Sequence, residues 1–368
     1  MGSVRTLLAI AVVFAHSYGF MFVGGQLAVQ LFYIISGFLI SYILVEAKSY
    51  TSIKGFYKNR FLRLYPIYWI VALATFTVYF VGGMFLEKDL GSISIIKQLD
   101  FTGSLALFAS NILLVGQDWI MFTAFSDGLF HLTTDFSDTD VPVWQGLLVP
   151  QAWTLGVEIS FYLLAPFILH NKRIIYILLT ASLALRIYLL FIGLGLKDPW
   201  TYRFFPTELA FFLFGALSHQ LLKPFYEKLE VISNRSSYMI SCGIFAFCFS
   251  LFMLPYKAYF ALILIAMFIL SLPFLFHFQS YNKWDRAIGE LSYPIYISHM
   301  LVIVFGGEIL SYLGIEVTSL LGAIIVVIAT IFVSFMINLS VGQFFESIRS
   351  KVKLTQNPNV STKNTLNE

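Results

Sequence analysis

Apolar residues form long runs that follow one another along almost the whole chain, separated by short polar stretches. Because a helix needs about 20 residues to cross the hydrocarbon core of a bilayer, runs of this length predict membrane-spanning helices and not barrel strands. The fold class that this pattern predicts is all-α, a polytopic membrane protein. We expect ten spans, over residues 4–23, 26–46, 66–86, 153–170, 174–194, 205–222, 238–255, 258–277, 293–313 and 318–342.

The pattern has one long interruption, over residues 87–152. Its middle, SIIKQLDFTGSLALFASNILLVG, is apolar enough to lie in or on the membrane without crossing it. Its end, DGLFHLTTDFSDTDVP, is acidic and predicts either a solvated outer loop or a sugar contact. After residue 345 the chain becomes polar, so we expect a membrane domain over 1–345 and a short disordered tail over 346–368.

Composition supports this class of protein. Of 368 residues, 58% are hydrophobic and 12% are charged, whereas soluble domains carry about 25% charged residues. We therefore exclude a soluble globular protein and expect membrane lipids, and no nucleic acid, as partners. The two cysteines, Cys242 and Cys248, lie six residues apart on different sides of one predicted helix, so we expect neither a disulfide nor a metal site.

The placement of the basic residues orients the chain. If the N-terminus is cytoplasmic, 17 of the 23 Lys and Arg fall in inner segments and five in outer ones. Cytoplasmic loops of membrane proteins carry this excess of Lys and Arg. We expect both termini to be cytoplasmic, in a multi-pass protein of the inner (cytoplasmic) membrane.

The first span carries two polar side chains, Arg5 and His16. They lie eleven residues apart, which is about 20° beyond three full helical turns and about 16 Å along the axis. One helix face can thus present a cation near one membrane surface and an imidazole deeper in. Two interpretations are open here: a functional pair, or an interfacial anchor plus a packed histidine.

Further polar groups occur within or beside the spans. Thr154, Glu158 and Tyr162 recur every four residues, so they share a helix face and suggest the wall of a polar pocket. A structural Glu paired with a neighbouring helix is the alternative. Arg60 and Arg63, three residues apart, face one way and suit a phosphate, although basic residues at this position also serve membrane insertion.

Small and polar residues mark three other places. Gly37 suggests close helix packing, and Ser36 beside it suggests either packing or a hydrogen bond in a cavity. Ser292, Tyr296 and His299 fall on a helix that Pro294 starts or kinks, and they suggest one cavity, with an interfacial histidine as the alternative. Arg186 and Glu208 are interpreted as a structural ion pair or as cavity residues.

Five stretches together resemble the acyltransferase-3 family of bacterial membrane O-acyltransferases. RTLLAIAVVFAH resembles its Arg–ten residues–His motif, and NRFLRLYP resembles its paired-arginine motif. QAWTLGVEISFY is similar to its Trp–x–Leu–x–x–Glu stretch. GGQLAVQLFYIISGFLI and ELSYPIYISH resemble two further signatures. Gly2 stands where relatives often have an Asp, and we expect the stand-alone form without the SGNH esterase-like domain that many relatives carry.

The resemblance implies an acyl-CoA donor, usually acetyl-CoA, and a hydroxyl acceptor on a surface glycan such as O-antigen, capsule or exopolysaccharide, free or lipid-linked. Arg5, Arg60 and Arg63 would hold the donor phosphates. His16 would act as general base or transient acyl carrier, and Glu158 would orient the imidazole or hold the acceptor. The residues expected to line or support the cavity are Ser36, Trp153, Tyr162, Ser292 and His299.

Two other functions stay open from the residues alone. A transporter or flippase for a glycan-related substrate would also use buried charges and a cavity, but the paired, Gly-broken helices and repeats of many carriers are not visible in the sequence. A non-catalytic assembly or sensory membrane protein would not need both His16 and Glu158 within spans.

Overall fold

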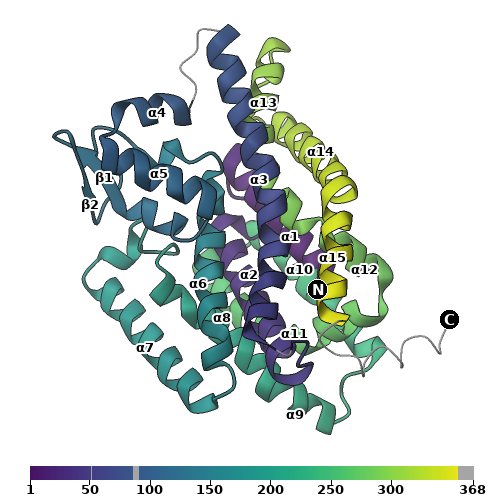
Figure 1. Ribbon diagram of the computed structural model, residues 1–368. Coiled ribbons are helices and arrows are strands. Elements are labelled where there is room, and N and C mark those ends of the chain that lie inside the picture. The colour runs from purple at the N-terminus through teal and green to yellow at the C-terminus, as the bar shows by residue number, and fades with distance from the viewer. Residues whose placement is uncertain (51, 86–90, 355–368) are drawn as a thin grey trace.

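The computed structural model describes residues 1–50, 52–85 and 91–354, of which helices form the great majority (Figure 1). Helix accounts for 79% of the structure, so the all-α class is confirmed. The α-helices are α1 Gly2–Ser17, α2 Gly24–Ser41, α3 Ile53–Phe85, α4 Ser92–Gln98, α5 Phe101–Leu113, α6 Trp153–Ile168, α7 Lys172–Phe191, α8 Phe205–Leu217, α9 Lys223–Lys228, α10 Asn234–Ser250, α11 Lys257–Tyr281, α12 Lys283–Glu290, α13 Ser292–Tyr312, α14 Leu320–Ile337 and α15 Gln343–Leu354.

Several helices continue as short π or 3-10 turns. The π turns are η1 Tyr42–Glu46 after α2, η6 Ser218–Leu222 between α8 and α9, and η8 Asn338–Gly342 between α14 and α15. The 3-10 turns are η2 Gln117–Phe122, η3 Val143–Gly146, η4 Pro150–Ala152, η5 Leu194–Leu196 and η7 Leu251–Met253. One antiparallel hairpin, β1 Thr123–Ser126 with β2 Leu129–Leu132, pairs Ala124 with His131.

Among the described residues, seven helices are long and apolar enough to cross a membrane. They are Gly24–Glu46, Ile53–Met84, Lys172–Phe191, Asn234–Met253, Lys257–Tyr281, Lys283–Tyr312 and Leu320–Val352. The other three expected spans correspond to α1, α6 and α8, which have 16, 16 and 13 residues. The protein is thus a multi-pass membrane protein, and the count of ten stays a prediction.

Two expectations about the elements are wrong. The third helix does not begin with the expected span 66–86, because α3 begins at Ile53 and carries Pro66 in its interior. The polar tail does not start as a disordered segment, because α15 extends to Leu354. The remainder of that tail, residues 355–368, lies outside the described residues.

The central helices are α1 and α2, which lie behind α3 in Figure 1, with α7 on one side and α14 and α15 on the other. Close packing of α2 on α8 depends on two glycines. A Cβ at Gly37 would lie 1.9 Å from the carbonyl oxygen of Phe212, and a Cβ at Gly215 would lie 1.9 Å from that of Ile34. The interpretation of Gly37 as a close-packing residue is confirmed.

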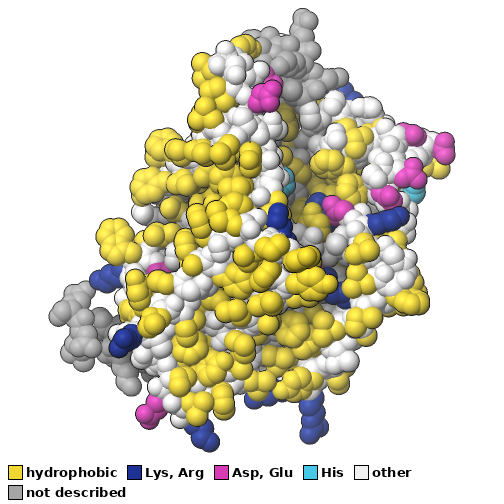
Figure 2. All heavy atoms as spheres, turned by 180° about the vertical axis from the view of Figure 1, so that it is seen from behind, with side chains coloured by type: hydrophobic (Ala, Val, Ile, Leu, Met, Phe, Trp, Pro, Cys, Tyr) yellow, Lys and Arg dark blue, Asp and Glu magenta, His cyan; other side chains and the backbone are white. Residues whose placement is uncertain are grey.

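The outer surface is what a bilayer requires. Figure 2 shows hydrophobic side chains over most of the back face, with Lys and Arg at its lower end. The helix α5, with 13 residues, is too short to cross a membrane and leaves Phe101 and Phe108 exposed, as expected for a segment in or on the membrane. Arg186 and Glu208 form the expected ion pair, and Cys242 and Cys248 are both free.

Candidate active site

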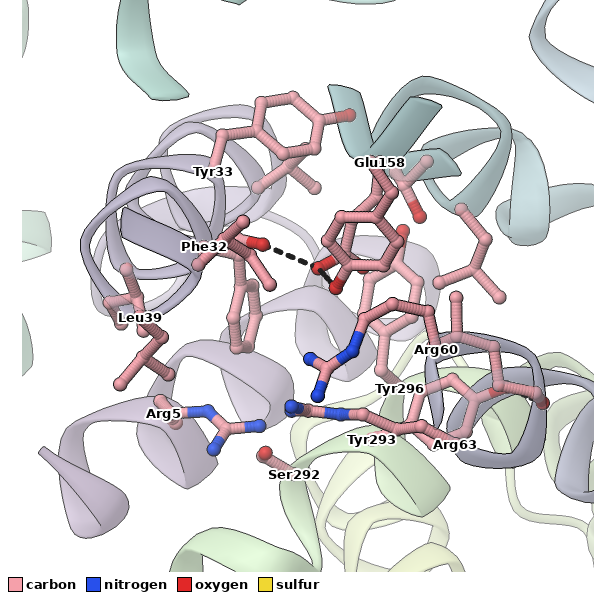
Figure 3. A pocket seen from close by; sticks show the side chains of 18 residues that line it. Arg5, Phe32, Tyr33, Leu39, Arg60, Arg63, Glu158, Ser292, Tyr293 and Tyr296 are labelled. Atoms are coloured by element: carbon pink, nitrogen blue, oxygen red, sulfur yellow. Dashed lines mark hydrogen bonds between the residues drawn. The ribbon is translucent and has the colours of Figure 1, made fainter. Parts of the chain in front are cut away.

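Five helices line a cavity of about 80 Å³ (Figure 3). Its polar lining includes most of the residues that the sequence analysis selected: Arg5 from α1, Ser36 from α2, Arg60 and Arg63 from α3, Thr154, Glu158 and Tyr162 from α6, and Ser292 and Tyr296 from α13. Its apolar lining comes mainly from α2, including Val29, Ile35 and Leu39. We call this the inner pocket.

Three guanidinium groups converge in the inner pocket. Figure 3 shows the side chains of Arg5, Arg60 and Arg63 pointing toward one another, although they come from two helices. Within the described part of the chain, no carboxylate forms an ion pair with any of the three. Like charges gathered without a counter-ion repel one another, so the arrangement favours an anion with several negative oxygens, such as a phosphate.

Arg60 is the most enclosed of the three, with 4% of its surface exposed. Its Nη2 donates to the side-chain oxygen of Asn59 at 2.7 Å, and its guanidinium lies 5.7 Å from the ring centres of Phe56 and Tyr162. Its Nε and Nη1 have no partner among the described residues. A buried N–H group without a partner is costly, so these atoms are suited to bind a ligand that enters the pocket.

Glu158 lies on the opposite wall, on the face of α6 that it shares with Thr154 and Tyr162. Its Oε1 accepts hydrogen bonds from Ser36 Oγ, at 2.7 Å, and from the Tyr162 hydroxyl. These two bonds fix the carboxylate between α2 and α6. The predicted shared face is confirmed, since all three residues line the inner pocket.

The start of α1, which positions Arg5, is held by Asp285 of α12. The Asp285 carboxylate accepts hydrogen bonds from the backbone N–H groups of Gly2 and Ser3, at 2.7 and 2.8 Å. A Cβ at Gly2 would lie 1.7 Å from the Asp285 carbonyl oxygen, so only glycine permits this approach. A carboxylate from another helix thus caps the N-terminus of α1.

His16 lies outside the lining of the inner pocket, beside His299. The two ring centres are 5.0 Å apart. His16 Nδ1 lies 2.9 Å from the carbonyl oxygen of Val12, and His299 Nδ1 lies 2.6 Å from that of Tyr296. Because a carbonyl oxygen only accepts, Nδ1 carries the hydrogen in both rings and each Nε2 keeps its lone pair. Each Nε2 can therefore take a proton.

Tyr296 lies between His299 and the inner pocket. Its ring lines the pocket, and the centre of the His299 ring lies 5.9 Å from it in an edge-on arrangement. Its hydroxyl donates to the carbonyl oxygen of Gln151 at 3.1 Å, which ties α13 to the segment before α6. The structure thus brings Arg5, Arg60, Arg63 and Glu158 together. It leaves the buried His299 and the exposed His16 outside the lining of this pocket.

Trp153 also lies outside the lining of the inner pocket. Its ring packs against the guanidinium of Arg203, at 4.5 Å, and against the ring of Tyr202, at 5.2 Å. Arg203 forms a two-pronged ion pair with Asp198 through bonds of 2.6 and 2.8 Å. Trp153 therefore supports the loop before α8 and does not touch the arginines of α3.

Sequence reasoning missed several residues of this region. Asp285 lies in KWDRAIGE, and no sequence pattern indicated its role, because its partner is the backbone of a helix about 280 residues away in the sequence. Asn59 stands directly before Arg60, and its position within NRFLR could have indicated a partner for the guanidinium. Tyr293 lines the inner pocket and stands next to Ser292, which was selected.

The architecture and the site are those of a multi-pass membrane protein with an arginine-lined pocket. The chain belongs to the acyltransferase-3 family, whose acyltransferase domain matches residues 2–339.

Curated relatives agree with this assignment. The O-acetyltransferase OatA of Staphylococcus aureus (strain NCTC 8325 / PS 47) is 26% identical over 335 residues, which cover 83% of this chain and 50% of that protein. The peptidoglycan O-acetyltransferase OatA of Listeria monocytogenes is 24% identical over 332 residues, 83% of this chain and 49% of that protein. The chain thus spans about half the length of these relatives. No solved structure matches.

Proposed function

We propose that this protein is a membrane O-acyltransferase that moves an acyl group, usually acetyl, from cytoplasmic acyl-CoA to a hydroxyl of a cell-envelope glycan. The observation that carries the proposal is the convergence of Arg5, Arg60 and Arg63, none in a direct ion pair with a described carboxylate, in a pocket that also holds Glu158. This pocket combines a site for the donor's phosphates with a hydrogen-bonded carboxylate.

On the donor side, guanidinium groups bind phosphate oxygens through paired N–H groups. The unpartnered Nε and Nη1 of Arg60 supply such groups. The pantetheine arm of the donor would run along the apolar wall of α2, which includes Val29 and Leu39, and would place the thioester toward Tyr296.

The transfer step has two forms, and both use Nε2 of His16. As a general base, His16 takes the proton of the acceptor hydroxyl while the hydroxyl oxygen attacks the thioester carbonyl. The C–S bond then breaks, and the thiolate of CoA takes up the proton from His16. As an acyl carrier, Nε2 attacks the carbonyl first, the C–S bond breaks and the thiolate of CoA leaves. The acceptor hydroxyl then attacks the acyl-imidazole, the C–N bond breaks, and the hydroxyl proton passes to the thiolate.

Either form requires the thioester to pass Tyr296, which lines the inner pocket and contacts His299, the ring neighbour of His16. A change of the Tyr296 side chain, with loss of its hydrogen bond to Gln151, would open this route. Glu158, held by Ser36 and Tyr162, would orient the reacting groups at the end of the pocket.

The acceptor is proposed as a class only. The Listeria relative is named for peptidoglycan, and a hydroxyl on a sugar of the cell envelope is the acceptor that we propose here.

The experiment is the mass of the envelope glycans in a strain that lacks the gene. We expect loss of increments of about 42 Da, the mass of an added acetyl group, and their return when the wild-type gene is restored. Complementation with His16→Ala should not restore them. Unchanged acetylation in the deletion strain contradicts the proposal, and loss of the whole glycan supports a transporter instead.

A further inference from the structure

A second cavity, of about 510 Å³, adjoins the inner pocket. The two cavities share Arg5, Arg63 and Tyr293, so these three side chains stand at their junction. The second cavity is bounded by α3, α12, α13, the π turn η8 and α15, and we call it the vestibule.

The vestibule is basic. Arg286 of α12 and Arg349 of α15 line it together with Arg5 and Arg63, against two carboxylates, Glu290 and Glu346. Four positive and two negative side chains leave a net charge of +2. A concave surface of this sign attracts anions.

Arg286 and Arg349 each form a contact within the protein and retain further N–H groups that can bind a ligand. Arg286 donates from Nη2 to the carbonyl oxygen of Ser280 at 2.6 Å. Arg349 is paired through Nη1 with Glu346, three residues earlier on α15. The Nε atom of Arg349 is buried and has no partner among the described residues. An unsatisfied buried N–H of this kind is suited to an incoming acceptor oxygen.

The size of the donor requires a second site. Pockets for drug-sized ligands measure about 300–1,000 Å³. The inner pocket, at about 80 Å³, is smaller than this, whereas the second cavity, at about 510 Å³, falls in that range. Acyl-CoA is a longer molecule, with a pantetheine arm at one end and a 3′-phosphorylated ADP at the other. When the arm lies in the inner pocket and the pyrophosphate lies near Arg5 and Arg63, the adenosine end falls in the vestibule.

We propose that the vestibule binds the 3′-phosphorylated adenosine end of acyl-CoA, and that Arg286 and Arg349 recognise its 3′-phosphate. This inference rests on the proposed function. It assigns a role to α15, which begins at Gln343, beyond the residues 2–339 that match the family. Phe345, also on the vestibule wall, offers an aromatic face to the adenine.

The test compares two donors, acetyl-CoA and acetyl-3′-dephospho-CoA, which differ only in the 3′-phosphate. In the purified wild type we expect a KM for acetyl-CoA at least about tenfold below that for the dephospho donor, since hydrogen bonds to charged groups contribute this much. In the double variant Arg286→Gln/Arg349→Gln the two KM values should become equal through a rise in the KM for acetyl-CoA alone.

The matched control is Arg235→Gln, an exposed arginine at the start of α10 that lines neither cavity. It should keep the wild-type ratio of the two KM values. If the double variant fails to fold, as judged by gel filtration, the single variants Arg286→Gln and Arg349→Lys serve instead, and each should lower the ratio.

The outcomes separate the two proposals. Equal use of both donors by the wild type, or a ratio that the variants leave unchanged, overturns the role of the vestibule but not the acyltransferase. Failure of the wild type to use either donor contradicts the proposed function itself.

Anionic lipid headgroups also carry phosphate and could bind the same arginines. The comparison of the two donors is therefore repeated with the protein in vesicles of phosphatidylglycerol, which is anionic, or of phosphatidylcholine, which has no net charge. We expect the same donor ratio in both; a ratio that follows the lipid would assign the arginines to lipid binding and overturn the inference.

Discussion

Arg60 differs from the other two arginines of the inner pocket in how firmly it is held. Asn59 accepts from its Nη2, and two aromatic rings lie beside its guanidinium. The side chains of Arg5 and Arg63, by contrast, are half-buried and form no hydrogen bond with another described residue. A guanidinium fixed in this way loses little side-chain freedom when it binds a ligand. Arg60 is therefore the residue on which we expect donor affinity to depend most.

Replacing Arg60 with Gln should weaken binding of CoA by about 10- to 100-fold, since a hydrogen bond to a charged group contributes about 1.5–3 kcal/mol. Arg60→Lys should recover only part of this, because an ammonium cannot form the paired contacts of a guanidinium. Isothermal titration of CoA into the detergent-solubilised protein measures both. CoA affinity equal to the wild type in Arg60→Gln and in Arg63→Gln would count against the phosphate site.

Asp118 offers a pH-dependent test outside the membrane spans. It lies on η2 against α6, where a Cβ at Gly156 would be 2.5 Å from its Oδ1, and that oxygen has no partner among the described residues. Burial raises the pKa of the Asp118 carboxyl from 3.8 to about 7. Between these values the folded protein holds more protons than the unfolded chain, so stability falls as pH rises through this window.

We therefore expect the Tm of the wild type to fall by several degrees between pH 5 and pH 8, and the Tm of Asp118→Asn to fall less. Thermal unfolding in detergent, followed by tryptophan fluorescence across this pH range, makes the measurement. Asp138→Asn, at an exposed carboxylate of the same outer segment, is the control and should follow the wild type. Parallel pH profiles for the wild type and Asp118→Asn would refute a buried, proton-holding carboxyl.

The spacing of residues along one helix correctly predicted which side chains share a face of that helix. Thr154, Glu158 and Tyr162 share a face because residues four apart lie on one side of a helix, and the structure confirms it. Spacing could not place His16 relative to the pocket, since that depends on Tyr296 of another helix. It also gave no signal for Asp285, whose partner is distant in sequence.

At the scale of elements, the contact between α2 and α8 depends on glycine at two facing positions. Gly37 and Gly215 each bring a helix backbone against a carbonyl oxygen of the other helix. Both helices lie next to the inner pocket, since Ser36 on α2 binds Glu158. The packing of α2 on α8 therefore fixes one wall of the site.

Gly37→Val should destabilise the protein by a large part of its folding free energy, because its added atoms meet backbone and not a flexible side chain. We expect a loss of monodisperse protein on gel filtration and a large fall in Tm. Gly243→Ala, at a helical position of α10 with nothing within 4 Å of the added Cβ, should behave as the wild type. A Gly37→Val protein as stable as this control would show that the helices do not pack as described.

The bounds of a helix were predictable from the sequence where hydrophobicity alone determines them. They were not predictable where packing against another helix determines them. The predicted span 26–46 agrees with the helix Gly24–Glu46. Pro66 is tolerated inside α3 because neighbouring helices can satisfy the backbone groups that a proline leaves free in a membrane protein. The helix α15 was missed because its sequence is polar, and its apolar face is covered by contact with α3.

For the molecule as a whole, the vestibule, the inner pocket and the two histidines follow one another in space. The vestibule adjoins the inner pocket at Arg5, Arg63 and Tyr293, and the pocket ends at Tyr296 beside His299 and His16. In the proposed orientation, a donor enters from the cytoplasm and its thioester approaches the imidazoles from the inner side. The account therefore makes His16 necessary for transfer and unnecessary for donor binding.

The most direct measurement is acetyl transfer by purified His16→Ala protein, with radiolabelled acetyl-CoA as donor and envelope glycan as acceptor. The account predicts loss of transfer by at least about 100-fold, with CoA affinity retained. His170→Ala, at an exposed histidine after α6, should transfer at the wild-type rate. A His16→Ala protein that acetylates the glycan as fast as this control would contradict the account.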